Sequence, residues 1–102
     1  MKQAFVLLYR PGPAWIEGKP VSEQPLREHL DYLSGLYQTG TLLMAGPFTD
    51  DTGGLGILNV ASQDEAENIL SRDPAVIEGV LTAELHLWDI VIKGTSGIRS
   101  TA

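Results

Sequence analysis

Two apolar runs near the middle of the chain, at 42–45 and 55–60, flank a polar, turn-rich segment. That segment contains the turn-forming residues Asp50, Asp51, Gly53 and Gly54. The alternation of apolar run, turn and apolar run predicts a β-hairpin. Because both runs are short and almost continuously apolar, we expect both faces of the hairpin to be covered.

Helical periodicity precedes the hairpin. Residues 22–39 predict an amphipathic helix with Ser22 as N-cap and Gly40 as the residue that ends it. Its apolar stripe consists of Leu26, Leu30, Leu33, Leu36 and Tyr37. His29 projects at the border between this stripe and solvent.

A second helix and a last strand follow the hairpin. Ser62 and Glu65 form a capping-box pattern, which predicts a helix that ends near residue 71. Asp73 then precedes a proline, as in a short capped turn. The stretch 80–92 predicts a strand, with apolar odd positions and mixed even positions.

With an apolar strand at 3–9, the elements follow the order βαββαβ. This order predicts an α+β, ferredoxin-like fold, in which an antiparallel four-stranded sheet carries two helices on one face. The other face would expose apolar side chains, Trp88 and Ile90 among them, which monomers seldom do. We therefore expect a homodimer with a small-molecule cavity between its sheets.

Residues 10–21 are rich in proline and glycine and predict a loop without regular structure. Trp15 lies inside this loop. A large aromatic side chain there either fixes the loop to the body of the protein or lines a pocket. Both interpretations remain open at the level of the sequence.

The composition limits the class of protein. The 102 residues predict one domain at 1–94 and a flexible tail at 95–102. With 7 basic and 13 acidic residues, the chain carries a formal net charge of −6, which disfavours nucleic acid and membrane surfaces as partners. Cysteine is absent, and no signal-peptide pattern begins the chain. We expect a cytoplasmic protein without a cofactor.

The two histidines are the first candidates for acid/base chemistry, because imidazole titrates near neutral pH. His29 is either a general acid/base or a helix-border side chain satisfied by a backbone carbonyl. His86 lies beside Glu84 and Trp88, and is either part of a site or an edge residue in water. Two histidines without further ligands predict no metal site.

Other candidates have equally plain structural roles. Asp73 either caps the turn at Pro74 or, in addition, partners a histidine. Gly46 and Pro47 end a strand, where the backbone either approaches a ligand closely or simply turns. The glycine-rich stretch 53–56 has no following helix and no Lys-Ser/Thr pair, which excludes a phosphate-binding loop.

Several segments together resemble the YCII-related (YciI-like) family. They are His29 with Leu33 and Leu36, the run Gly40 to Pro47, the Asp73-Pro74-Ala75-Val76 motif, and Gly79-Val80. The resemblance covers residues 3–93 and implies the dimeric α+β-barrel fold. It also implies that His29 and Asp73 form an acid/base pair in a pocket, and that substrates are small ring compounds. We assign Tyr9, Gly46, Pro47 and Trp88 to the expected substrate-binding surface.

Two functions remain in competition. The first is a small cofactor-free enzyme in which His29 and Asp73 move a proton on a cyclic or aromatic substrate, as an isomerase or a dehydrohalogenase-like lyase does. The second is a non-catalytic protein that holds a small molecule in a cavity at the dimer interface. The sequence shows no obvious group to stabilise an oxyanion, which keeps the second hypothesis open; we favour the enzyme.

Overall fold

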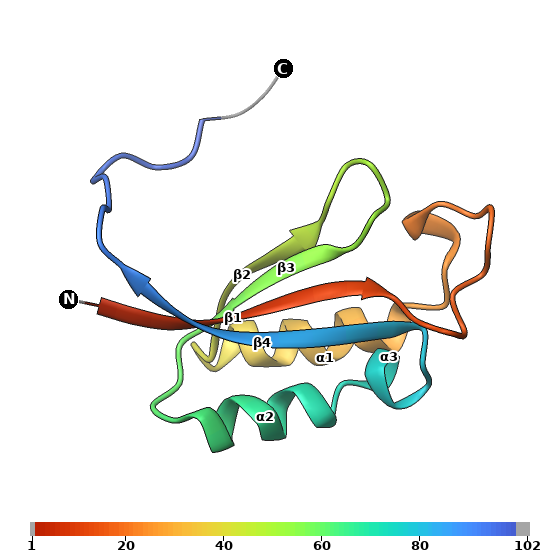
Figure 1. The fold of residues 1–102 in the computed structure, drawn as a ribbon, viewed down its shortest axis with the longest axis horizontal. Coiled ribbons are helices and arrows are strands. Elements are labelled where there is room, and N and C mark those ends of the chain that lie inside the picture. Colours follow the sequence, from red (N-terminus) through yellow and green to blue (C-terminus); the bar gives the residue numbers. More distant parts are fainter. Residues whose placement is uncertain (1, 100–102) are drawn as a thin grey trace.

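A four-stranded antiparallel sheet organises the computed structural model, which describes residues 2–99 (Figure 1). The strands are β1 (Lys2–Pro11), β2 (Leu42–Pro47), β3 (Gly54–Leu58) and β4 (Leu81–Ile90). The helices are α1 (Arg27–Gln38), α2 (Gln63–Ser71) and α3 (Pro74–Ile77), with a 3₁₀ turn at Val21–Glu23. The predicted α+β class and βαββαβ order are confirmed, with α3 as an additional short helix.

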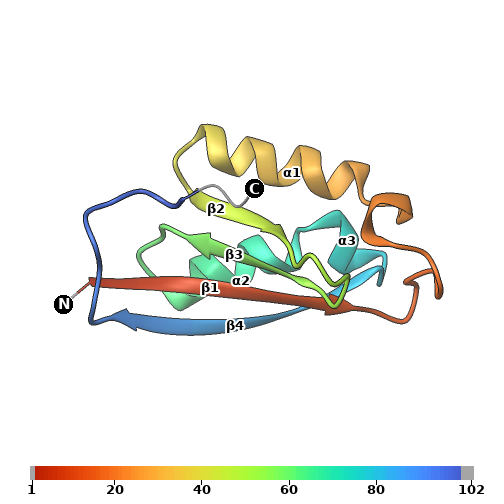
Figure 2. The ribbon, with the colours of Figure 1, turned by 90° about the horizontal axis from the view of Figure 1, so that it is seen from above.

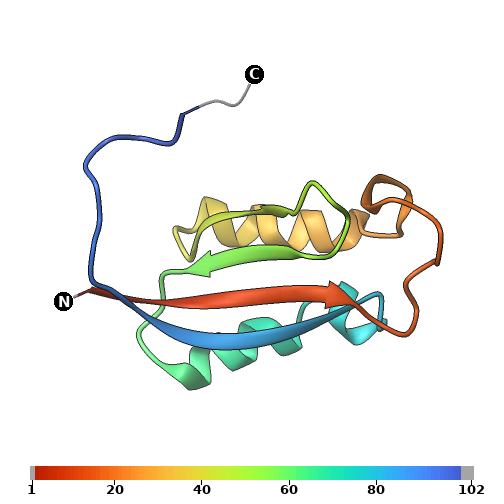
Figure 3. The ribbon, with the colours of Figure 1, turned by 45° about the horizontal axis from the view of Figure 1, so that its top comes forward.

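The strand order is β2-β3-β1-β4, and the helices lie on the same side of the sheet (Figure 1). Seen from above, α1 runs beside the edge strand β2, whereas α2 lies behind the central strands (Figure 2). The odd residues of β1 face the helices and form the centre of the core: Phe5, Leu7 and Tyr9. Helix α1 is therefore placed at the edge of the sheet and not over its middle (Figure 3).

The opposite face of the sheet, which we call the open face, carries no helix. By the strand register it presents half-buried apolar side chains from β1 and β3: Val6, Leu8, Leu55 and Ile57. On β2, Leu43 is 49% exposed and Met44 is 51% exposed. The expectation that both hairpin strands are covered on both faces is thus wrong for β2 in the single chain.

Helix α1 begins at Arg27, five residues after the predicted N-cap, so the assignment of Ser22 as N-cap is wrong. The cause is Pro25, which disfavours helical backbone in the residue before it. Gln24 accordingly adopts extended angles (φ −81°, ψ 152°) and separates the 3₁₀ turn from α1. The helix ends as predicted at Gly40, whose φ is +78°.

The buried face of α1 differs from the predicted stripe. His29 is only 7% exposed and Leu33 only 8%, while Leu30 and Tyr37 are 60% and 67% exposed. The expectation of His29 at a solvent border is therefore wrong. Because α1 lies beside β2, the side of the helix that carries His29 packs inward and the side that carries Leu30 faces a cavity.

The caps after the hairpin form as predicted. The Ser62 hydroxyl accepts a hydrogen bond from the Glu65 N–H at 3.2 Å, and α2 buries Ala66 completely. The reciprocal bond of the Glu65 carboxylate goes to the N–H of Ala61, at 2.9 Å. Asp73 caps α3, and Gly79 follows with a φ of +76°.

Several hydrogen bonds hold the proline-rich loop in place, and the Gln24 side chain forms three of them. The Gln24 amide donates to the carbonyl oxygens of Ile16 and Lys19 at 2.9 and 3.0 Å, and accepts from the Ile16 N–H at 2.8 Å. Trp15 packs against the core and also lines a cavity, so both interpretations of it apply. The loop is thus ordered, and it forms part of the wall of this cavity.

The last strand ends at Ile90, two residues before the predicted end at Ile92. Residues 91–99 contain no helix or strand, and the final part of the predicted tail, 100–102, lies outside the described residues. Among residues 2–99, no helix has both the length and the apolar character to cross a membrane.

Candidate active site

The structure brings His29 and Asp73 into direct contact, although they are 44 positions apart in the chain. The His29 Nδ1 lies 2.8 Å from Asp73 Oδ1 and 2.7 Å from Oδ2. His29 comes from the first turn of α1, and Asp73 from the residue that caps α3. Asp73 is 1% exposed, so this pair is buried.

Two further groups orient the Asp73 carboxylate. Its Oδ1 accepts the N–H of Ala75 at 3.0 Å, which is the capping bond of α3. Its Oδ2 accepts a long hydrogen bond from the Tyr9 hydroxyl, at 3.4 Å. The two roles considered for Asp73 therefore coexist: it caps a helix and it partners a histidine.

The contact with the carboxylate fixes the chemistry of the imidazole. A carboxylate accepts hydrogen bonds, so it favours the tautomer of His29 with the proton on Nδ1. Within the described part of the chain, no group bonds Nε2, and no fully buried side-chain nitrogen or oxygen lacks a partner. Nε2 therefore reaches the surface of a cavity, where in the neutral ring it is a proton acceptor.

Tyr9 completes the surroundings of the pair. Its ring meets the His29 ring edge-on, with centroids 5.3 Å apart and planes at 81°. Burial, reinforced by the Asp73 charge, raises the pKa of the Tyr9 phenol far above its usual value of 10.0. Tyr9 consequently remains a neutral donor toward Asp73 over the physiological range.

A large cavity lies between α1 and the β2–β3 hairpin, and we call it the trough. Its volume is about 1020 Å³, and His29 and Tyr9 line it. Apolar side chains dominate its other walls, including Trp15, Leu30, Leu33, Tyr37 and Leu42. Such a surface suits a ring-shaped ligand with few polar groups.

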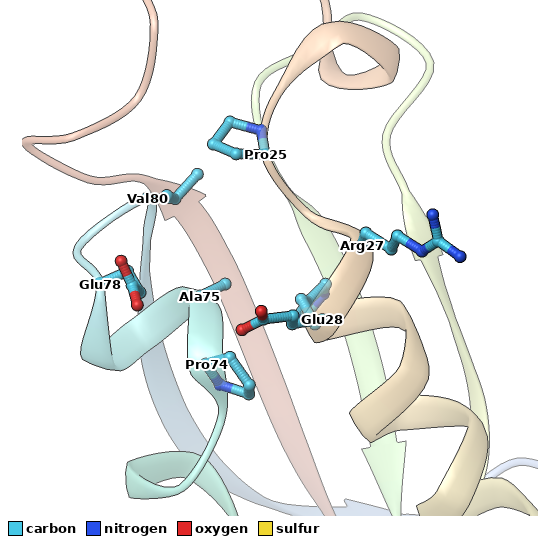
Figure 4. A pocket seen from close by; sticks show the side chains of 8 residues that line it. Pro25, Arg27, Glu28, Pro74, Ala75, Glu78 and Val80 are labelled. Atoms are coloured by element: carbon cyan, nitrogen blue, oxygen red, sulfur yellow. The ribbon is translucent and has the colours of Figure 1, made fainter.

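A second cavity lies on the other side of His29, between α1 and α3, and we call it the small hollow. Its volume is about 250 Å³, and it is lined by Pro25, Arg27, Glu28, His29, Pro74, Ala75, Glu78 and Val80. Figure 4 shows the side chains of Glu28 and Glu78 on this side of α1. His29 and Arg27 line both cavities, so His29 stands between the apolar trough and a smaller space whose lining includes Glu28 and Glu78.

Three of the four residues assigned to substrate binding lie together. Tyr9, Gly46 and Pro47 all line the trough. Trp88 does not: it pairs with Ala4 in the register, lies on the open face and is 45% exposed. The single chain therefore gives no support to Trp88 as a ligand contact.

The sequence did not identify Arg27, Leu30 or Tyr37 as part of a site. Leu30 and Tyr37 were assigned to the core stripe of the predicted helix, and Arg27 was not part of that stripe. Their helical spacing shows only that they share one side of α1, not that this side faces a cavity.

The remaining candidates lie apart from the pair. His86 is exposed, and its Nε2 lies 3.3 Å from an equally exposed Glu84 carboxylate. This position fits the interpretation of His86 as an edge residue in water. Among residues 2–99, no three potential metal ligands gather in one place.

Comparisons with known proteins agree with this architecture. The family model of the YCII-related domain matches residues 3–89. "Uncharacterized protein YjpA" of Bacillus subtilis (strain 168) is 30% identical over 69 residues, which are 68% of this chain and 81% of that protein. This chain is also similar, with a TM-score of 0.57, to the solved structure of 5-chloro-2-hydroxyhydroquinone dehydrochlorinase (TftG) from Burkholderia phenoliruptrix AC1100 in complex with 2,5-dihydroxybenzoquinone. The two chains are 26% identical, and the similarity covers 83% of this chain and 93% of the TftG chain. The chain belongs to the YCII-related family.

Proposed function

We propose that this protein is a small cofactor-free enzyme that transfers a proton on a cyclic or aromatic substrate, with His29 as general acid/base and Asp73 as its partner. The observation that carries this proposal is the buried bidentate contact between the two, with the opposite ring nitrogen open to a cavity. A positioned acid/base accelerates a reaction by roughly 10²–10⁴-fold. That factor suffices for a substrate whose proton is already acidic.

In this mechanism the Nε2 of His29 removes a proton from the substrate. Asp73 stabilises the resulting imidazolium ion, and the Tyr9 hydroxyl keeps the carboxylate in position. The proton then returns to another atom of the ring, which is an isomerisation, or a leaving group departs with its electron pair, which is an elimination. Both outcomes restore neutral His29 once its proton is passed on.

The similarity to TftG supports the elimination branch. That relative is a dehydrochlorinase, and its structure was solved with a small quinone. Its identity to this chain is 26%, which leaves the substrate of this protein to experiment.

We also propose that the protein acts as a homodimer, in which the open faces of two sheets pack together. Support comes from the apolar side chains that this face presents in the single chain, among them Val6, Ile57 and Met44. Covering such a face with a second copy removes apolar surface from water, at roughly 25 cal/mol per Å².

The test compares the two histidines in turnover of chlorinated and hydroxylated ring compounds. His29→Gln should lower kcat by about 100-fold or more, because glutamine still hydrogen-bonds Asp73 but cannot take a proton. His86→Gln is the matched control: His86 lies on the open face away from the trough, and glutamine keeps a polar side chain there, so this variant should retain wild-type activity. Equal losses in the two variants would contradict the assignment. A metabolite that co-purifies unchanged, with no turnover of any ring compound, would favour the non-catalytic binding protein.

A second variant isolates the charge of Asp73. Asn caps helices about as well as Asp, so Asp73→Asn should keep the α3 cap. Its amide N–H can donate to Nδ1, which would move the imidazole proton to Nε2 and remove the base. We expect a large fall in kcat with little change in folding, and an altered tautomer in the ¹⁵N spectrum of His29. An unaltered tautomer with full activity would refute the partnership.

A further inference from the structure

Tyr32 takes no part in the mechanism above, yet it connects the two elements that carry the buried pair. Its hydroxyl donates a hydrogen bond of 2.7 Å to the backbone carbonyl of Ile69. Tyr32 lies on α1, three residues after His29. Ile69 lies in the last turn of α2, four residues before Asp73. The bond therefore joins the same two parts of the chain as the contact between His29 and Asp73.

Within residues 2–99, two hydrogen-bonded contacts join α1 to the segment 63–77, which contains α2 and α3. One is the contact of His29 with Asp73, and the other is the bond of Tyr32 to Ile69. Two residues that are three positions apart lie on the same side of a helix. A single contact would leave α1 a point about which to pivot, whereas two contacts on one side restrain both its rotation and its shift along its axis.

The carbonyl that Tyr32 binds lies at the end of α2 from which Asp73 emerges. The last carbonyls of a helix have no regular partner within it. The Ile69 carbonyl accepts the Arg72 N–H only at 3.3 Å, so the bond from Tyr32 is the shorter of the two. The Asp73 N–H bonds the carbonyl of Leu70, the next residue, also at 3.3 Å. Tyr32 thus ties to α1 the turn that leads into Asp73.

The surroundings of Tyr32 suit a structural donor and not a ligand contact. Its half-buried ring packs against the core, and it lines neither the trough nor the small hollow. Burial, reinforced by the Asp73 charge and partly opposed by Arg72, raises the pKa of the Tyr32 phenol above its usual value of 10.0. The hydroxyl therefore remains a neutral donor to Ile69 at physiological pH.

We propose that Tyr32 is a positioning residue, which keeps the His29 imidazole aligned with the Asp73 carboxylate by fixing α1 to the end of α2. This inference rests on the proposed function, because the alignment affects turnover only if His29 transfers the proton. A misplacement of roughly 1 Å can cost an enzyme about 100-fold in rate. Because Tyr32→Phe removes one hydrogen bond and keeps the packing of the ring, we expect a smaller fall in kcat, of about tenfold.

The experiment compares Tyr32→Phe with Ser71→Ala. The Ser71 hydroxyl donates to the carbonyl of Asn68 at 3.1 Å, in the same last turn of α2, and does not reach α1. The first measurement needs no substrate. The NMR signal of the proton on His29 Nδ1 should move upfield in Tyr32→Phe, because its hydrogen bond to the carboxylate lengthens, and should stay in place in Ser71→Ala.

The second measurement is turnover of the ring compounds. Tyr32→Phe should lower kcat about tenfold and leave KM within about twofold, since Tyr32 lines neither cavity, and Ser71→Ala should match the wild type. An unmoved His29 signal in Tyr32→Phe, equal changes in the two variants, or a moved signal with unchanged kcat would overturn the proposal. A loss of stability to urea with an unmoved signal would assign Tyr32 to the fold alone.

Failure of the proposed function has a different signature. If the wild type turns over no ring compound, or if His29→Gln retains full activity, His29 is not the acid/base. The position of the His29 Nδ1 proton signal in Tyr32→Phe would then still decide whether Tyr32 aligns the buried pair.

Discussion

The two histidines lie on opposite sides of one sheet, and their surroundings differ in every respect that matters for chemistry. His29 is buried on the helix side against a carboxylate that is 1% exposed. His86 is on the open face, and both it and Glu84 have more than half of their side-chain surface in water. Each pair consists of a histidine and a carboxylate, and each carboxylate has a further partner: Asp73 accepts from Ala75 and Tyr9, and Glu84 from the exposed Arg10. Only the buried pair adjoins a cavity. A histidine–carboxylate contact alone therefore does not identify a site.

The largest expected effect comes from breaking the buried pair. Asp73→Ala removes the cap of α3 and leaves His29 and Tyr9 without their common partner. Removal of one member of a buried pair costs about 3–5 kcal/mol, so urea unfolding should show a marked loss of stability. Glu23→Ala, at the exposed ion pair with Lys19 away from the sheet, should leave the unfolding midpoint almost unchanged. Similar losses in the two variants would mean that burial does not distinguish the pairs.

A smaller effect is expected from a charge on the open face. Ile57→Asp places a carboxylate at the centre of the proposed dimer interface, where an unpaired charge costs several kcal/mol. Sedimentation at micromolar concentration should then show a monomer in place of a dimer. Ile77→Asp is the control, because this side chain is 69% exposed on α3 and lies on the helix side. A wild-type protein that sediments only as an 11.0 kDa species would contradict the dimer.

The predictable part of the fold consists of local signals. Ser62, Asp73 and Gly40 mark helix ends by the chemistry of their own side chains or backbone, and the structure confirms all three. The predicted start of α1 also relied on a local signal, the cap-like Ser22. The structure starts the helix at Arg27 instead, because Pro25 disfavours helical backbone at Gln24. The order of elements followed from these boundaries.

The site was harder to predict, because it depends on how helices and strands pack together, which the periodicity of apolar residues does not show. The burial of His29 follows from the position of α1 beside β2, and the sequence gives only the spacing of residues on a helix. Trp88 shows the same limit for strands. Alternation along β4 separates Trp88 from Leu87, but only the register with β1 shows which of them faces the helices.

The smallest expected effect appears at alkaline pH, where we compare the buried Tyr9 with the exposed Tyr37. Folding raises the pKa of Tyr9 above its unfolded value of 10.0, because burial and the Asp73 charge both oppose the phenolate. The folded state therefore holds its phenol proton where the unfolded state releases it. The resulting stability is fully present below pH 10 and is lost as the pH rises beyond it.

Tyr9→Phe should flatten this alkaline decline in urea unfolding midpoints measured from pH 8 to pH 11. Tyr37→Phe, which alters a side chain that is 67% exposed, should retain the wild-type slope. If Tyr9→Phe declines as steeply as the wild type, the phenol of Tyr9 is not the buried neutral donor that holds Asp73 in place.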